Sequence, residues 1–127
     1  MKAGNDITLV AEEGASLSSG SLRLYALPYG CVDLYAFDPL NRRCAVGIAV
    51  ATGHRRQGHA LAMLEALSAQ YRGTLHQFYA DIAATNTASL TLFRKAGYTE
   101  CGRFREWLSV DGGYVDTIRM QMIISTE

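Results

Sequence analysis

Apolar residues alternate with polar or aromatic ones along much of the first half of the chain, a pattern typical of strands in a half-buried sheet. The pattern predicts four strands, over residues 7–12, 21–27, 31–38 and 44–50. Turn-forming clusters at residues 28–30 and 38–41 separate the last three strands, so we expect an antiparallel meander. The segment 44–50, CAVGIAV, does not alternate. It predicts a strand buried on both faces, with Gly47 either at a bulge or at a close approach to the backbone.

The hydrophobic period becomes helical between residues 57 and 71. The predicted apolar stripe of this helix consists of Ala60, Leu61, Leu64, Leu67 and Tyr71. Gly73 is expected to end the helix, and residues 75–82 predict the next strand. A strand, helix, strand order implies a parallel neighbour reached by a right-handed crossover.

A second helix is predicted after this strand, with Asn86 as its N-cap. Its expected buried side consists of Ala88, Leu92 and Ala96. Gly97 stands where a left-handed C-cap residue is needed, which places Tyr98 against Phe93.

The remaining residues predict a hairpin, 102–110 and 114–124, around a tight turn at residues 111–113. Together the elements predict one α/β domain over residues 1–127.

Composition and charge limit the classes of function that this chain can have. The chain has 127 residues, 49% of them hydrophobic, the size of one domain with a core. Its 12 basic and 12 acidic residues cancel, so we expect it to bind neither nucleic acid nor an anionic membrane. No stretch is long and apolar enough for a bilayer span or an export signal, and we expect a cytoplasmic protein. The three widely spaced cysteines, Cys31, Cys44 and Cys101, predict neither a disulfide nor a metal site.

The stretch GHRRQGHALAML, residues 53–64, joins the predicted buried strand to the first helix. The start of a helix carries unpaired N–H groups and a partial positive charge, and a glycine there lets a phosphate approach closely. Gly58 has this position. The stretch lacks both the Gly-Lys-Ser/Thr ending of a P-loop and the three-glycine dinucleotide fingerprint, so nucleotide hydrolysis and hydride transfer are not expected.

Two motifs resemble those of the GCN5-related N-acetyltransferases. Arg55-x-x-Gly58-x-Ala60 is similar to the motif with which that family holds the pyrophosphate of acetyl-coenzyme A. Residues 86–98, NTASLTLFRKAGY, resemble its later signature, and residues 33–43 and 101–122 resemble its spermidine and ribosomal-protein N-acetyltransferase branch. The resemblance implies a mixed, mostly antiparallel sheet with a cofactor-binding helix after the fourth strand and a shortened N-terminus.

The resemblance also implies roles for single residues. The backbone of Ile48 and Val50 would pair with the pantetheine arm and the thioester carbonyl, which is chemically reasonable because the arm carries amides that a strand edge can bind. Asn86 and Ser89 would support the pantetheine and the neighbouring loop, and Phe93 would lie near the sulfur. The implied cofactor-binding set is Ile48, Val50, Arg55, Arg56, Gln57, Gly58, His59, Ala60, Asn86, Ser89 and Phe93.

Three features depart from the family pattern. Phe93 stands where the family usually has a tyrosine that protonates the departing thiolate, and Cys44 and Ala45 stand where many members carry a glutamate. We therefore assign no catalytic residue. General acid catalysis contributes about two to four orders of magnitude, so its loss slows transfer without abolishing it. Residues 13–21, EGASLSSGS, stand in place of two helices that wall the acceptor site.

The short segment 13–21 predicts a sheet covered on one face only. Strands 21–27 and 31–38 would then expose leucine, valine and tyrosine side chains, and such a surface favours self-association. We therefore expect a homodimer in which the second copy completes the acceptor wall.

Other polar residues have two interpretations. Asp33, Asp38, Glu106 and Asp116 either attract a cationic amine or are solvated strand residues. The three histidines, His54, His59 and His76, have no ligand spacing, and we expect them at the surface or in hydrogen bonds.

These observations predict an acetyl-coenzyme A-dependent N-acetyltransferase acting on a primary amine, by direct attack in a ternary complex. The acceptor would be a polyamine, a small amine or a protein N-terminus. Two alternatives remain: a coenzyme A binding module without transferase activity, and a structural homodimer with a vestigial cofactor loop.

Overall fold

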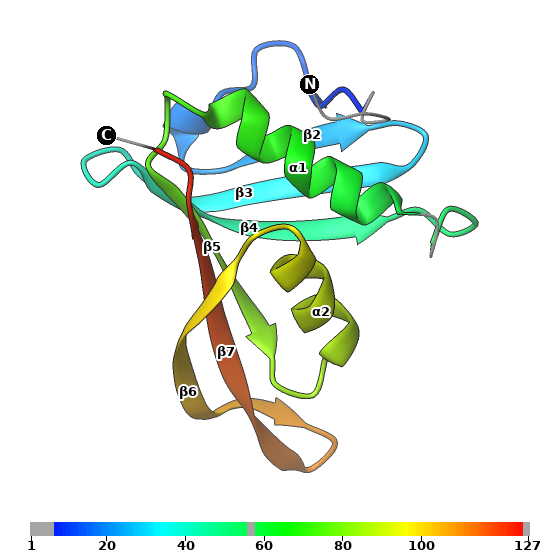
Figure 1. Ribbon diagram of the computed structural model, residues 1–127, viewed down its shortest axis with the longest axis vertical. Coiled ribbons are helices and arrows are strands. Elements are labelled where there is room, and N and C mark those ends of the chain that lie inside the picture. The colour runs from blue at the N-terminus through cyan, green and yellow to red at the C-terminus, as the bar shows by residue number, and fades with distance from the viewer. Residues whose placement is uncertain (1–6, 56–57, 126–127) are drawn as a thin grey trace.

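The computed structural model describes residues 7–55 and 58–125, whose strands form one sheet in the order β1-β2-β3-β4-β5-β7-β6 (Figure 1). The strands are β1 (Val10–Ala11), β2 (Leu22–Ala26), β3 (Gly30–Asp38), β4 (Arg43–Val50), β5 (Gln77–Ala83), β6 (Thr99–Val110) and β7 (Gly113–Ile123). The helices are α1 (His59–Tyr71) and α2 (Thr87–Lys95). Among these described strands, only β4 and β5 pair in parallel. The predicted α/β class, with a mostly antiparallel sheet and a helix after the fourth strand, is confirmed.

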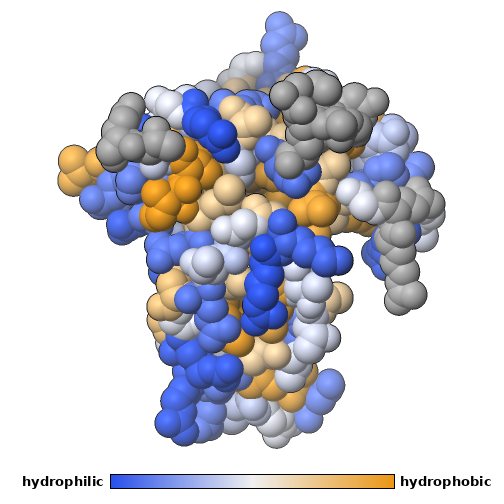
Figure 2. All heavy atoms as spheres, in the orientation of Figure 1, coloured by the Kyte–Doolittle hydropathy of each residue, from blue (hydrophilic) through white to orange (hydrophobic). Residues whose placement is uncertain are grey.

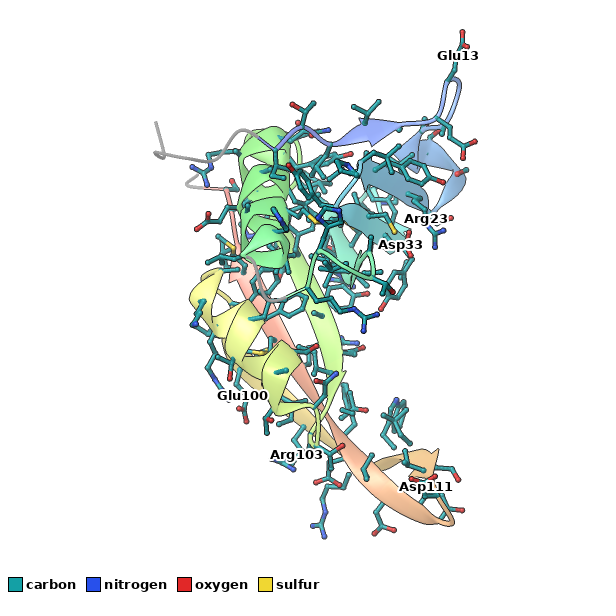
Figure 3. The ribbon with its side chains drawn as sticks, turned by 90° about the vertical axis from the view of Figure 1, so that its right-hand side faces the viewer. Glu13, Arg23, Asp33, Glu100, Arg103 and Asp111 are labelled. Atoms are coloured by element: carbon teal, nitrogen blue, oxygen red, sulfur yellow. The ribbon has the colours of Figure 1, made fainter. Side chains whose placement is uncertain are left out.

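Both helices lie on the same face of the sheet, α1 over β2 to β4 and α2 beside β5 and β7 (Figures 1 and 3). The apolar residues that alternate along the strands point to this face, where they join the helices in one core. Met63, Leu64 and Leu67 of α1 are 0% exposed. Hydrophilic residues cover much of the lower part of the view in Figure 2, around α2 and the β6–β7 hairpin. Helix α2 exposes Arg94 and Lys95 and buries Leu90 and Phe93, so it is an amphipathic cover of the sheet.

Two predicted strands are shorter or less buried than expected. The ladder predicted over 7–12 forms only at Val10 and Ala11. In β4, Cys44, Ala45 and Val46 are buried, but Ala49 is exposed, so burial on both faces holds only for the first half. The reason is non-local, because β5 pairs with β4 only as far as Ala45.

The sheet irregularity lies in β3 and not at Gly47. Gly47 pairs regularly with Asp33, whereas the register shifts between Tyr35 and Asp38, where Ala36 has a φ of 53°. The Tyr35 ring lies 3.8 Å from the place that a Cβ on Gly47 would take. This is an ordinary van der Waals distance, so the structure shows no close approach that requires glycine at position 47, and the bulge interpretation is wrong.

The predicted ends of α2 are confirmed. The side-chain oxygen of Asn86 accepts a hydrogen bond from the backbone N–H of Ser89 at 3.2 Å. Gly97 has a φ of 103°, and the Tyr98 ring meets Phe93 edge-on at 4.9 Å between centroids. Local capping chemistry therefore sets both ends of this helix.

The predicted buried side of α2 is wrong except at Ala96. Leu90 and Phe93 are buried, whereas Ala88 is exposed and Leu92 is only partly buried. Both stripes have helical spacing, but a leucine and a phenylalanine bury more apolar area than an alanine and a leucine. The helix therefore turns its larger apolar pair toward the sheet.

The expected uncovered apolar face is also corrected. The segment 13–21 contains no α-helix, only a 3-10 turn at Leu17–Ser19, as predicted. However, α1 covers the leucines and valines of β2 and β3, and Leu24 and Val32 are 2% and 0% exposed. The opposite face of these strands carries polar pairs such as Arg23 and Asp33, joined by bonds of 2.6 and 2.9 Å. The sheet is covered on one face only, as predicted, and Leu27 and Tyr35 are 77% and 43% exposed, but the other leucines and valines of these strands are buried under α1. The premise of the homodimer prediction is therefore wrong only in part, and self-association itself stays a prediction.

Large exposed apolar side chains gather instead near the tip of the β6–β7 hairpin, which extends away from the rest of the sheet (Figure 1). Asp111 and Gly112 have φ angles of 49° and 79°, as the predicted tight turn requires. Trp107 and Tyr114 are 65% and 66% exposed. None of the described helices is both long and apolar enough to cross a membrane.

Candidate cofactor-binding site

The site begins where β4 and β5 separate. The two strands pair at three positions, the last joining Ala45 to Tyr79. Beyond this point, residues 46–50 of β4 pair only with β3, and residues 80–83 of β5 pair only with β7. Two strand edges thus face a widening gap in the sheet. A strand edge of this kind can form backbone hydrogen bonds with an extended chain that carries amides.

The loop after β4 leads directly to the start of α1. Gly58 precedes the first helical residue with a φ of 81°, a conformation that glycine adopts without steric cost. No side chain caps this helix, and a Cβ added to Gly58 would have nothing within 4 Å. Arg55 donates a 3.5 Å hydrogen bond to the carbonyl of Val50, which joins the loop to the strand end. The start of α1 carries a partial positive charge and therefore suits an anion.

A hollow of about 450 Å³ lies between the start of α1 and the outer side of α2. It is lined by Val50, His54, Gly58, His59, Ala60, Leu61, Ala88, Thr91, Leu92 and Lys95. Four of the predicted site residues, Val50, Gly58, His59 and Ala60, therefore meet in one place. Arg56 and Gln57 lie outside the described residues.

The other predicted residues do not line this hollow. Ile48 is partly buried and packs against the core. The Asn86 side chain caps α2 by bonding to Ser89. Phe93 is 3% exposed and belongs to the core, whereas its neighbour Leu92 faces the hollow.

Sequence reasoning missed the contributions of Tyr29, His54 and Lys95. The Tyr29 ring stacks on His59 with centroids 4.0 Å apart and meets His54 edge-on at 5.3 Å. Lys95 lines the same hollow from α2. The lysine was visible in the 86–98 signature, but nothing in the sequence indicated that the turn with Tyr29 approaches the start of α1.

Burial keeps the titratable groups near the closed end of the gap neutral. Burial raises the pKa of the Cys44 thiol to about 12, so this cysteine is not a thiolate at neutral pH. Burial and the nearby Cys44 also raise the pKa of Tyr98, whose hydroxyl has no hydrogen-bond partner among the described residues. Neither group is placed as a nucleophile or a general base.

Three of the four acidic residues considered for amine binding, all aspartates, have arginine partners. Asp33 pairs with Arg23 on the open face of the sheet (Figure 3). Asp116 pairs with Arg103 at 2.6 Å, and it also accepts a bond from the backbone N–H of Glu106, which lowers its pKa.

Asp38 likewise lies 3.3 Å from Arg43, and its bonds from Asn41 lower its pKa. The structure therefore supports the interpretation of these three aspartates as strand residues paired at the surface.

The chain was compared with known proteins. Residues 11–99 match the model of the acetyltransferase (GNAT) domain. The spermidine N(1)-acetyltransferase of Vibrio cholerae serotype O1 is 27% identical over 99 residues, which are 76% of this chain and 57% of that protein. This chain therefore spans little more than half the length of that curated relative.

Solved structures show the same fold. The spermidine N-acetyltransferase of Vibrio cholerae in complex with CoA and spermine has a TM-score of 0.77 at 22% identity, over 84% of this chain and 67% of that one. The ribosomal L7/L12 alpha-N-protein acetyltransferase RimL has a TM-score of 0.79 at 22% identity, over 87% and 73%. With the matched domain model covering most of the chain, these findings show that the protein belongs to the GNAT acetyltransferase family.

Proposed function

We propose that this protein binds acetyl-coenzyme A and transfers its acetyl group to a primary amine. One observation carries the proposal. The pairing of β4 and β5 stops at Ala45, and the rest of β4 leads through a loop to Gly58, the start of α1 and the hollow beside it. The gap edge suits the amides of a pantetheine arm, and the helix start suits a pyrophosphate. The open space at Gly58 fits the approach of a phosphate to the backbone.

Bound acetyl-coenzyme A would supply an activated acetyl thioester. The backbone of residues 46–50 would hold the arm extended, and an N–H from this edge would stabilise the negative charge that develops on the carbonyl oxygen. In direct transfer the amine nitrogen would form a bond to the carbonyl carbon as the carbon–sulfur bond breaks. Coenzyme A would leave as its thiolate and take a proton from water, and the amine proton would pass to water. With Cys44 buried as a neutral thiol, no side chain of the described gap region is assigned a covalent step.

The proposed substrate class is inferred from the substrates that the relatives' names give. One is named a spermidine N(1)-acetyltransferase and another a ribosomal-protein N-acetyltransferase. Both acceptors present a primary amine, and for this chain we propose a polyamine, a small amine or a protein N-terminus.

A coenzyme A binding module without transferase activity is the second candidate. Phe93 at the usual general-acid position favours it, because a phenylalanine ring has no proton to donate. The lack of an α-helix within residues 13–21 favours it too, since the family's acceptor wall is then incomplete.

Release of free thiol from acetyl-coenzyme A, measured with a panel of polyamines, small amines and peptides, tests the proposal. We expect release that depends on one class of amine. Calorimetric titration with acetyl-coenzyme A is run alongside. Binding without amine-dependent release would identify the binding module, and absence of binding would exclude both candidates.

Replacing Phe93 by tyrosine should raise the rate of the chemical step about tenfold, a modest share of what general acid catalysis supplies. The resemblance assigns Phe93 to the leaving-group position, although its ring is 3% exposed and does not line the hollow, so the variant tests whether a phenol here protonates the departing thiolate. Cofactor affinity should change little. Single-turnover acetyl transfer measures the effect. Phe104→Tyr, on the opposite face of the sheet, serves as the control. An unchanged single-turnover rate, with chemistry limiting, would contradict the assignment of Phe93 to the leaving-group position.

A further inference from the structure

The gap between β4 and β5 opens to both faces of the sheet. On the helix face it meets the hollow lined by His54, His59 and Lys95, where the proposed function places the cofactor. Neither α1 nor α2 covers the opposite, open face, and Figure 3 shows Arg23 and Asp33 on this side. Because the cofactor would fill the helix side of the gap, an acceptor would reach the thioester from the open face.

Tyr35 of β3 lies at the open side of the gap. It pairs with Ala45, the last residue of β4 that also pairs with β5, and its ring lies 3.8 Å from the place of a Cβ on Gly47. Tyr35 is 43% exposed, so an incoming ligand can reach its phenol. Partial burial and the carboxylate of Asp81 raise the pKa of Tyr35. The phenol is therefore neutral at pH 7 and does not serve as a general base.

Two carboxylates on this side of the sheet are each engaged by an arginine. Asp81 follows the last pair of β5 with β4, and its oxygens accept bonds of 2.8 and 2.9 Å from Arg119, which lies over the Tyr79 ring. Asp33 accepts bonds of 2.6 and 2.9 Å from Arg23. A carboxylate that takes a proton from an amine gives up its charge and with it the ion pair. Neither aspartate is therefore placed as a general base.

We propose that the acceptor is the α-amine of a peptide or protein, which attacks without a general base and is held by the phenol oxygen of Tyr35. This inference rests on the proposed function. An α-amine has a pKa of about 8 and a lysine-type alkylamine one of about 10.4, so at pH 7 the neutral fraction of the α-amine is about 300 times larger. A neutral amine attacks a thioester directly, whereas an ammonium group first has to lose a proton.

The transfer step balances with water as the only proton carrier. The amine nitrogen bonds to the acetyl carbonyl carbon, and the carbon–sulfur bond breaks with its electron pair on sulfur. The nitrogen then loses one proton to water, and the thiolate takes one proton from water. The phenol oxygen of Tyr35 accepts a hydrogen bond from the amine N–H and so holds the nitrogen on the open side of the gap.

The charges around Tyr35 support the same class of acceptor. The carboxylates of Asp33 and Asp81 are matched by the guanidinium groups of Arg23 and Arg119. These four groups carry no net charge together, so they provide no field that would concentrate a polycation such as a polyamine. A peptide N-terminus carries at most one positive charge at its amine and does not need such a field.

The test is an internal competition in one synthetic peptide that has a free N-terminus and a single lysine. The full chain acetylates it with acetyl-coenzyme A at pH 7, mass spectrometry identifies the acetylated nitrogen, and a reaction without protein gives the background to subtract. We expect the α-amine to react about tenfold faster than the lysine, less than the ratio of neutral fractions because a more basic amine is the better nucleophile once neutral. Thiol release with a lysine-free peptide should rise with pH and level off above about pH 8.

Gly47→Glu tests the approach from the open face. A Cβ at this position meets the Tyr35 ring at 3.8 Å and the Asp33 side chain at 4.0 Å, which are ordinary contacts. The new carboxylate has no arginine assigned to it and can serve as a base beside the gap. It should raise lysine acetylation about tenfold at pH 7, a modest share of what general base catalysis supplies, and raise α-amine acetylation less. Gly47→Gln, which adds the same bulk without a base, should raise neither.

Tyr35→Phe tests the contact with the amine. It should raise the KM for the lysine-free peptide about fivefold, the value of one neutral hydrogen bond, with little change in kcat. Tyr114→Phe, which removes an exposed hydroxyl near the hairpin tip, should change neither constant.

Lysine or spermidine acetylated faster than the α-amine at pH 7, at a rate that stays the same at pH 9, would overturn this inference and leave the proposed function intact. A lysine rate unchanged by Gly47→Glu, or a peptide KM unchanged by Tyr35→Phe, would overturn the placement of the acceptor at Tyr35. Absence of acetylation above background for every amine would overturn the proposed function together with this inference. Thermal unfolding of each variant confirms that it is folded.

Discussion

Gly58→Val is expected to weaken acetyl-coenzyme A binding about 100-fold, the loss that follows when two backbone donors to a charged phosphate are blocked. Gly58 lines the hollow with a φ of 81°, and its missing Cβ faces open space. A branched side chain there would occupy the space through which a phosphate approaches the first N–H groups of α1. It would also be strained in this left-handed conformation. Calorimetric titration measures the loss.

Gly73→Val is the matched control for strain. Gly73 follows the other end of α1 with a φ of 93°, and a Cβ added there also meets nothing within 4 Å. Both variants should lose a similar amount of stability, but only Gly58→Val should lose affinity. If the two variants bind acetyl-coenzyme A equally well, the helix start is not the pyrophosphate site.

Phe78→Ala is expected to lower the free energy of unfolding by about 3 to 5 kcal/mol, the usual cost of removing a buried aromatic ring. Phe78 is 0% exposed, lies between Cys44 and Met122 in the sheet, and meets the Tyr71 ring edge-on. It therefore packs where the two halves of the sheet join, just before β4 and β5 separate. A single domain is stable by only about 5 to 15 kcal/mol, so this loss is large. Urea unfolding followed by circular dichroism gives the value.

Tyr114→Ala provides the comparison, since Tyr114 is also aromatic but is 66% exposed near the hairpin tip. Its replacement should change the free energy of unfolding by no more than about 0.5 kcal/mol. Equal effects of the two substitutions on the free energy of unfolding would mean that packing of Phe78 between β4 and β7 does not stabilise the core.

Much of the architecture could be predicted from sequence because its signals are local. The turn glycines, the Asn86 cap and the change from alternating to helical periodicity each act within a few residues of chain. The change to helical periodicity near residue 57 likewise predicted the helix start to within two residues of His59. Four residues of the predicted set, Val50, Gly58, His59 and Ala60, line one hollow, and their role in cofactor binding stays a prediction.

Other features were decided only by contacts between distant segments. Periodicity offered two apolar stripes on α2, and packing against the sheet selected the one with Leu90 and Phe93. Contacts between α1 and the sheet likewise buried Leu22 and Leu24 of β2, which the sequence had predicted to be exposed.

In the candidate site, too, some features follow from local sequence and others from contacts between distant segments. The sequence by itself determined the strand, the glycine and the helix start, because hydrogen bonds within a short segment specify them. The tertiary structure decided where β5 leaves β4 and brought Tyr29 and Lys95 to the loop with His54. These placements depend on how sheet twist, side-chain volume and loop position balance across the whole core, and no local pattern encodes that balance.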